Sequence, residues 1–177
     1  MKADVRPGWP AAVAIALTLA ALLAGAPRPV LAAEPSIRGK PAADFALKAV
    51  SGQNVRLSEH LGEVVLLNFW ATWCGPCRLQ MPRLEQLHAT YGSAGLVLLG
   101  MNVDDDAAHA VEFVRTIGVS YPVLLDPRKA VAPLYDLDAV PMTVLIDRAG
   151  VVRFVHYDYD PAIEKLYVAE LRQLLDE

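Results

Sequence analysis

The sequence predicts an α/β protein built on a central mixed sheet flanked by helices. An apolar run at residues 64–70 is rich in β-branched and aromatic side chains, as expected of a strand buried on both faces. After it, apolar residues return every three or four positions from Cys77 to Tyr91, which indicates an amphipathic helix. A second apolar run at 96–103 predicts a parallel strand, because this alternation of strand and helix is typical of parallel sheets.

The first 32 residues are predicted to be a targeting segment. Lys2 and Arg6 precede a long apolar stretch, and residues 30–32 offer small side chains for cleavage, which is the layout of a secretory signal peptide. An uncleaved N-terminal membrane anchor is the alternative, because residues 7–27 carry no charge and are about long enough to cross a bilayer. Cleavage is favoured, since prolines make this stretch a poor continuous helix. Export is expected in either case.

Residues 33–43 are expected to form a linker, and residues 44–177 a single, monomeric domain. The formal net charge is −4, and it becomes −6 without residues 1–32, because three cations and one acid are lost. An acidic domain without a basic stripe gives no reason to propose a nucleic-acid partner.

Further elements are expected on both sides of the first strand and helix. Residues 45–47 and 54–57, joined by a turn with Gly52, predict an N-terminal hairpin. After the second strand, the sequence predicts a helix at 107–117, capped by Asp104, Asp105 and Asp106. A strand at 121–125 and a short helix at 128–134 follow, and then a hairpin of strands 142–147 and 151–156. The last helix is expected to begin at Asp160 and Pro161, with Ile163 and Tyr167 on its buried stripe. For the three aspartates, helix capping is preferred to metal binding.

The only two cysteines, Cys74 and Cys77, stand where the buried strand passes into the helix. Unpaired N–H groups and the helix dipole favour negative charge at this position, and the thiolate is the reactive form of cysteine. Cys74, at the helix entry, is therefore expected to be the exposed nucleophile. Cys77, one turn later, is expected to be the shielded thiol that resolves a mixed disulfide. A structural disulfide is the alternative, but so short a loop stabilises little by chain entropy.

The run from Leu67 to Arg78 contains Trp-Cys-Gly-Pro-Cys and resembles thioredoxin. With Pro82 after it, the same run resembles the exported TlpA/ResA-like thiol–disulfide oxidoreductases. Residues 39–47 and 140–150 match that family in the expected order. The resemblance implies a thioredoxin-like fold with an N-terminal β-hairpin and an extra central βα insert.

The resemblance also implies site residues around the dithiol. Trp73, Gly75 and Pro76 would support it. Pro141 would follow a cis peptide bond and face the cysteines, and Val140 would offer its backbone to an extended client by β-strand addition. From the residues alone, a proline at the first position of a strand is unremarkable.

Two positions depart from the family pattern. Asn68 stands where thioredoxin has a buried aspartate, and Gln80 where many TlpA/ResA-like proteins have a glutamate. Either carboxylate would accept the proton of Cys77 during resolution, so the two amides leave the proton acceptor unidentified. No histidine has the spacing of a Cys/His pair, and none is assigned a role. The departures weaken a specific prediction of a ResA-type role in cytochrome c maturation.

Two functions from different classes remain. The favoured one is a periplasmic protein disulfide reductase that needs no cofactor beyond its redox-active Cys74–Cys77 disulfide. It would draw electrons from a membrane thiol transporter and act on client proteins with disulfides or paired thiols, such as apocytochromes, copper-site thiol pairs or misoxidised proteins. The alternative is a soft-metal module that binds Cu(I) through both thiolates or matures a copper site. Arg78 stands where covalent haem attachment needs histidine, and the P-x-x-x-T-x-x-C pattern of a peroxidatic cysteine is absent.

Overall fold

The computed structural model describes residues 37–177, apart from the side chains of Ala162 and Ile163. The predicted targeting segment, the first part of the predicted linker and the predicted burial of Ile163 lie outside this description. The described residues belong to one compact unit. Among them, none of the helices has the length and apolar character needed to cross a membrane.

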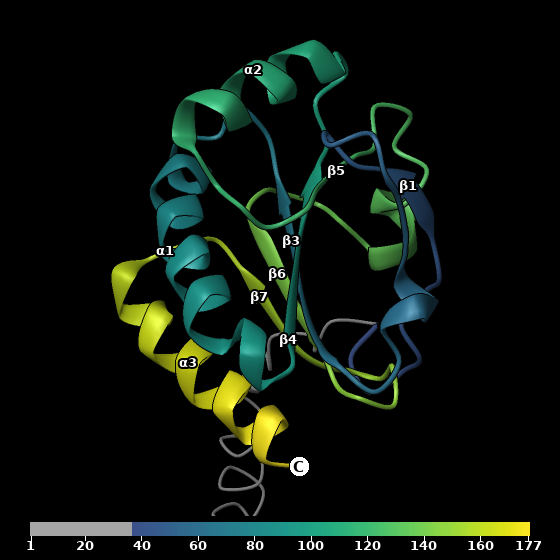
Figure 1. Cartoon of the computed structure of the whole chain (residues 1–177), viewed down its shortest axis with the longest axis vertical. Helices are drawn as coiled ribbons and strands as arrows, with labels where there is room; N and C mark the ends of the chain where they lie inside the picture. Colours follow the sequence, from purple (N-terminus) through teal and green to yellow (C-terminus); the bar gives the residue numbers. More distant parts are fainter. Residues whose placement is uncertain (1–36) are drawn as a thin grey trace, which may run out of the picture. The chain divides into compact units, whose positions relative to one another are not determined.

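Five strands form a mixed sheet in the order β5-β4-β3-β6-β7 (Figure 1). Central β3 (Val64–Trp70) is parallel to β4 (Leu96–Asn102) and antiparallel to β6 (Met142–Ile146). The outer strands are β5 (Val123–Leu125) and β7 (Val152–Tyr157). Every residue of β3 is buried, which explains why its sequence shows no polar alternation. The predicted mixed α/β sheet is confirmed.

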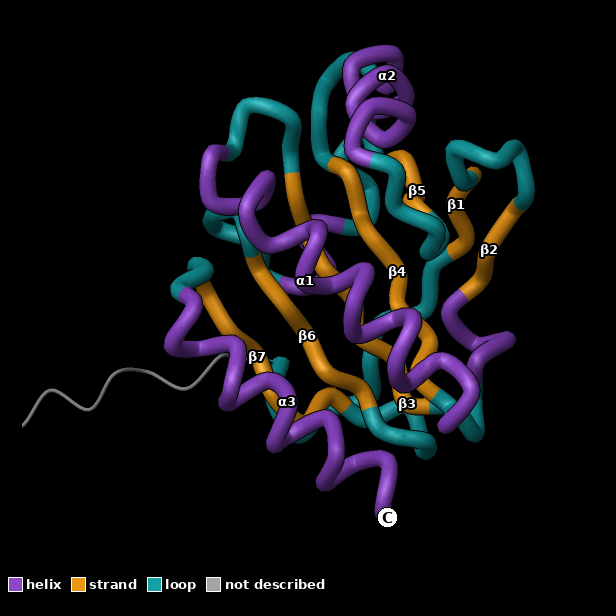
Figure 2. The backbone as a smooth tube through the Cα atoms, turned by 60° about the vertical axis from the view of Figure 1, so that its left-hand side comes forward, coloured by secondary structure: helices purple, strands orange, loops and turns teal. Residues whose placement is uncertain are grey.

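Helices α1 (Gly75–Tyr91) and α3 (Pro161–Asp176) lie side by side on one face of the sheet (Figure 2). Arg172 of α3 donates from Nε to the Tyr91 hydroxyl at 2.9 Å, which joins the two helices. The third helix, α2 (Ala107–Ile117), packs Phe113 against Trp70 of β3, with 5.6 Å between the ring centroids. All three predicted long helices therefore form.

The predicted N-terminal hairpin also forms, from β1 (Ala46–Lys48) and β2 (Asn54–Arg56). It helps to cover the other face of β3. There, Phe69 lies 5.4 Å from Tyr135, and Tyr135 lies 6.3 Å from Phe45, between ring centroids. Tyr135 ends the 3-10 helix Ala132–Tyr135, so the hairpin and the insert after β5 share one layer of the core.

The insert differs from the predicted helix at 128–134. The buried Asp126 carboxylate accepts hydrogen bonds from the backbone N–H groups of residues 130–132, at 2.7, 2.9 and 3.1 Å. Lys129 has a φ of 54°, in the left-handed region, so an α-helix does not run through it. The prediction is therefore wrong about the start and the type of this helix.

The three aspartates before α2 have three different partners. Only Asp106 is the N-cap, accepting from the Ala108 N–H at 2.9 Å. Asp105 binds the Lys129 ammonium at 2.5 Å, and the buried Asp104 accepts a hydrogen bond from Asn102 Nδ2 at 2.9 Å. The prediction that all three cap the helix is correct for Asp106 alone.

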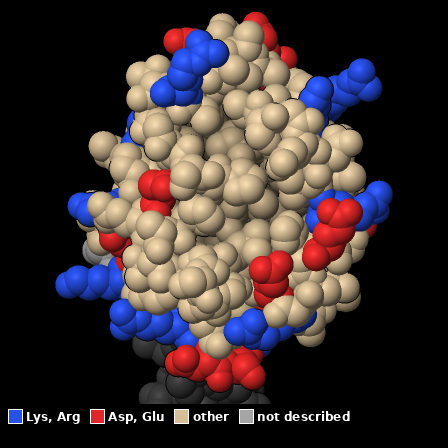
Figure 3. All heavy atoms as spheres, in the orientation of Figure 1, with Lys and Arg blue, Asp and Glu red and all other residues tan. Residues whose placement is uncertain are grey.

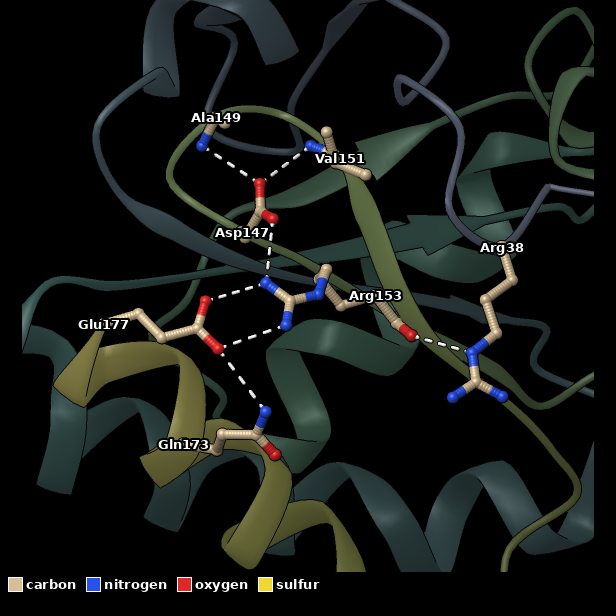
Figure 4. Close-up of polar contacts among 7 residues, drawn as sticks. All are labelled: Arg38, Asp147, Ala149, Val151, Arg153, Gln173 and Glu177. Carbon is tan, nitrogen blue, oxygen red and sulfur yellow. Dashed lines mark hydrogen bonds and ion pairs between the residues drawn. The ribbon is translucent and has the colours of Figure 1, made fainter.

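Asp147 and Arg153 organise the turn between β6 and β7. The Asp147 carboxylate accepts two backbone N–H groups of the turn, at 3.0 and 2.9 Å, and Arg153 joins it to Glu177 (Figure 4). The backbone carbonyl of Arg153 accepts a hydrogen bond from Arg38 at 3.1 Å. The last helix and the segment before β1 are thus held to the same hairpin.

Removing the Asp126 carboxylate should destabilise the insert. Asp126→Ala leaves three backbone donors without their acceptor, and one buried unsatisfied donor costs about 1–3 kcal/mol. We expect the free energy of unfolding in urea to fall by at least about 2 kcal/mol. The matched control is Asp106→Ala, which removes an exposed cap and should cost about 1 kcal/mol. Equal losses in the two variants would contradict this role of Asp126.

Candidate active site

Cys74 and Cys77 are joined by a disulfide at the N-terminus of α1. Residues 71–74 carry the chain from β3 into the helix, and Cys74 is the N-cap. Its Sγ accepts a hydrogen bond from the backbone N–H of Cys77 at 3.1 Å. Cys74 is 4% exposed and Cys77 is 0% exposed, so Cys74 is the sulfur nearer to solvent.

Three of the predicted site residues surround Cys74 on the surface. Trp73 is 71% exposed, and Gly75 and Pro76 are also exposed. Pro76 lies in the first turn of α1, where its missing N–H leaves no helical hydrogen bond unmade. Cys74 itself is buried, so the disulfide lies beneath the surface that Trp73 and the first turn of α1 expose, and the expectation of an exposed Cys74 is not met in the disulfide form.

Charged groups hold the loop before Cys74 on both sides of Thr72. The Thr72 N–H donates to both oxygens of Asp104, at 3.1 and 3.2 Å. The Arg78 guanidinium donates to the Thr72 carbonyl, at 3.0 Å from Nε and 2.7 Å from Nη2. Asp104 also accepts from Asn102 Nδ2 at 2.9 Å. The sequence analysis did not predict these hydrogen bonds, because no local spacing links Asp104 or Arg78 to Thr72.

An uncharged cluster, which we call the amide floor, lies one turn after Cys77 on the buried side of α1. Its members Asn68, Gln80 and Thr143 come from β3, α1 and β6, and all are buried. Asn68 Nδ2 donates to Gln80 Oε1 at 2.9 Å and to Thr143 Oγ1 at 3.2 Å. Gln80 Nε2 donates to Thr143 Oγ1 at 3.0 Å. The two amides that depart from the family pattern thus bond to each other.

Tyr167 leads from beside the amide floor to the backbone of Pro141. Thr143 Oγ1 accepts from both amides, and burial raises the pKa of Tyr167 by more than the Thr143 side chain lowers it. Burial raises the pKa of Tyr167 to about 12, so this hydroxyl stays protonated at neutral pH and donates to the Asp158 carbonyl at 3.2 Å. The Asp158 N–H donates to the Pro141 carbonyl at 3.0 Å. The sequence pattern places Tyr167 on a buried stripe but gives no sign of this role.

Val140 and Pro141 lie at the end of the sheet that carries the dithiol. The peptide bond between them is cis, and Met142, the next residue, pairs with Phe69 near the end of β3. Pro141 is buried, Val140 is half-buried, and Met142 is completely buried in the core. The structure therefore brings both predicted docking residues to the edge where β3 leads into the disulfide loop.

A surface groove is lined by Trp73 and by the segment that leads to Pro141. Leu137, Ala139 and Val140 belong to this lining, and the volume of the groove is about 490 Å³. We call it the Trp73–Val140 groove. An extended segment lying there would meet the exposed indole and the Val140 backbone together.

Comparison with known proteins identifies relatives with the same elements. Residues 38–155 match the AhpC/TSA family. The thiol-disulfide oxidoreductase ResA of Geobacillus kaustophilus (strain HTA426) is 36% identical over 65% of this chain and 66% of its own length. The ResA protein of Bacillus subtilis (strain 168) is 35% identical over 70% of this chain and 69% of its own length. The match thus spans about two thirds of these relatives.

Solved structures give the same result for the fold. A crystal structure from Chlorobium tepidum, described as a thiol:disulfide interchange protein DsbE, has a TM-score of 0.76 and 35% identity, covering 78% of this chain and 97% of that one. A solution structure from Bacteroides thetaiotaomicron, described as a protein disulfide isomerase, has a TM-score of 0.74 and 33% identity, covering 79% and 91%.

These relatives confirm the predicted thioredoxin-like fold and the resemblance to ResA-like proteins. They also support the prediction of an oxidoreductase. The chain belongs to the AhpC/TSA family, and within it the chain is similar to the ResA thiol–disulfide oxidoreductases.

Proposed function

We propose that this protein is an exported thiol–disulfide oxidoreductase that works as a protein disulfide reductase. The observation that carries the proposal is the hydrogen bond from the Cys77 N–H to Cys74 Sγ at the N-terminus of α1. The same N–H would stabilise a Cys74 thiolate, because a backbone donor and the helix dipole both favour negative charge there. The similarity to ResA proteins supports the same chemistry.

In the proposed cycle, the reduced dithiol passes two electrons to a client disulfide. The Cys74 thiolate attacks one client sulfur, which forms a Cys74–client bond and releases the other client sulfur as a thiolate. Cys77 then loses its proton and attacks Cys74 Sγ. This step forms the Cys74–Cys77 bond present in the structure and releases the second client sulfur.

Client docking is proposed to use the backbone of Val140. A client strand that pairs with this N–H and C=O would gain affinity with little dependence on its own sequence. The half-buried Val140 lines the same groove as Trp73, so such a strand would pass beside Cys74.

Electrons have to be supplied continually, because the periplasm is kept oxidising. We propose that a membrane thiol transporter re-reduces the Cys74–Cys77 disulfide, with the N-terminal segment directing export of a monomeric domain. On the face drawn in Figure 3, Lys and Arg side chains are scattered among Asp and Glu rather than gathered in a stripe. This distribution gives no support to a nucleic-acid partner on that face.

The resolving step has to remove the proton of Cys77. The amide floor holds no carboxylate, and an amide is a poor base. Burial of Cys77 raises the cost of forming its thiolate. We propose that water takes the proton, so that deprotonation of Cys77 limits resolution near neutral pH.

The copper-binding alternative gains no support from residues 37–177. They hold no group of three or more His, Cys, Asp or Glu side chains that could bind a metal ion. Cys74 and Cys77 would be the two soft ligands of such a site.

A carboxylate in the amide floor should accelerate resolution. Gln80→Glu places a carboxyl group next to Asn68 Nδ2 and Thr143 Oγ1, the atoms that Gln80 now contacts. Burial would raise the pKa of this carboxyl group toward neutrality. Because the ionised form takes the proton of Cys77, mixed disulfides should resolve faster as the pH rises through this pKa. Stopped-flow release of a client thiol, measured from pH 5 to 9, would show the added titration.

The matched control is Gln86→Glu, which adds the same charge at an exposed position of α1. It should leave the pH–rate profile unchanged. An identical profile for Gln80→Glu and the unmodified protein would exclude position 80 from proton removal.

Removing the resolving sulfur should trap clients. The full chain with Cys77→Ala, expressed with its export segment, keeps the attacking Cys74 but not the thiol that releases the client. It should accumulate disulfide-linked partners that mass spectrometry identifies, whereas Cys74→Ala should capture none. Capture through Cys77 instead would reverse the proposed roles. If nothing is trapped while the unmodified reduced protein binds Cu(I) tightly, the metal module replaces the reductase.

A further inference from the structure

We propose that the Trp73–Val140 groove selects client segments that carry arginine or lysine beside the cysteine under attack. This inference rests on the proposed function and adds the chemical class of the client. It follows from the charges that line the groove, from the position of Asp138 and from the exposed ring of Trp73.

The groove has an excess of negative charge. Its charged lining residues are Asp136, Asp138 and Lys129. The Lys129 ammonium is 2.5 Å from a carboxylate oxygen of Asp105, which is not a lining residue, so the one cation of the lining is already matched from outside. Asp136 also has an interaction partner of its own, so the Asp138 carboxylate sets the potential that an arriving client meets.

Asp138 is placed to contact a client directly. It is exposed, it lines the groove with Val140, and within residues 37–177 it makes no hydrogen bond or ion pair. A cationic client side chain would therefore not have to displace a protein donor from this carboxylate.

The field of these carboxylates reaches the docking edge. Burial raises the pKa of Tyr157, and the negative charges of Asp138 and Asp136 raise it further. Tyr157 is the register partner of Met142, the residue after Pro141. Both charges thus act beside the backbone to which a client would pair.

The apolar lining suits the rest of a long basic side chain. Leu137 and Ala139 offer apolar surface for its methylene groups, while the charged head reaches Asp138. The Trp73 ring is 71% exposed and lines the same groove, so a guanidinium can lie over it as a cation–π partner. Arginine gains from both contacts, which ranks it above lysine.

The same charges disfavour acidic clients, and specificity is the difference between the two effects. An exposed ion pair contributes about 0.2–1 kcal/mol, which corresponds to roughly 1.4- to 5-fold in rate or affinity. High salt should reduce this preference, because the Debye length falls to about 3 Å at about 1 M salt.

The test uses three disulfide-containing peptides that differ only in the residue next to the cysteine: arginine, glutamine or glutamate. The reduced full-length protein should reduce the arginine peptide about two- to fivefold faster in kcat/KM than the glutamine peptide, with the glutamate peptide slowest. The three rates should converge at about 1 M salt. Asp138→Asn should reduce the differences in kcat/KM among the three peptides, and Asp138→Lys should make the glutamate peptide the fastest and the arginine peptide the slowest.

The matched control is Asp176→Lys, the same charge change at an exposed position near the end of α3, and it should keep the order seen in the unmodified protein. Equal rates for the three peptides would overturn the inference and leave the proposed reductase standing. The inference would also be overturned if Asp138→Lys changed kcat/KM by the same factor for all three peptides. Failure to reduce any peptide would instead remove the proposed function.

Discussion

Burial of β3 on both faces fixes the position of the dithiol. The strand pairs along its length with β4 and over most of it with β6, so a slip of one residue would exchange the side chains that pack on its two buried faces and disrupt the packing of both. The chain leaves this strand at Trp70 and enters α1 at Gly75, which sets Cys74 among the first N–H groups of the helix. The neighbouring strands supply the rest of the site. Strand β4 leads to Asp104, which accepts a hydrogen bond from the Thr72 N–H, and β6 carries Thr143 after Pro141.

Local patterns predict much of this arrangement. The apolar run of β3 and the spacing of α1 can each be recognised within one stretch of sequence, and both predict their element correctly. Contacts between distant residues cannot be recognised in this way. Asp104 has the position of a helix cap, but it turns toward the Thr72 amide, 32 positions earlier. The helix predicted at 128–134 does not form as such, because Lys129 is in the left-handed region and Asp126 binds the N–H groups of residues 130 and 131.

The amide floor is neutral, and this affects stability as well as chemistry. A buried carboxylate would have to be desolvated, whereas amide and hydroxyl groups that bond to one another avoid that cost. Asn68 Nδ2 and both polar atoms of the Gln80 amide are paired within the floor, whereas the buried Asn68 Oδ1 has no hydrogen-bond partner among the described residues. None of these hydrogen bonds contains a group that titrates near neutral pH. Folding of this part of the core is therefore insensitive to pH, while proton removal from Cys77 has no built-in base.

Either amide of the floor, Asn68 or Gln80, can be changed to the corresponding acid by a single base substitution. Codons for asparagine and aspartate differ by a single base, and so do codons for glutamine and glutamate. Thr143 lies within hydrogen-bond distance of both amides, and its hydroxyl can donate to a carboxylate as readily as it now accepts from an amide. One point mutation thus separates this chain from an acid-bearing site.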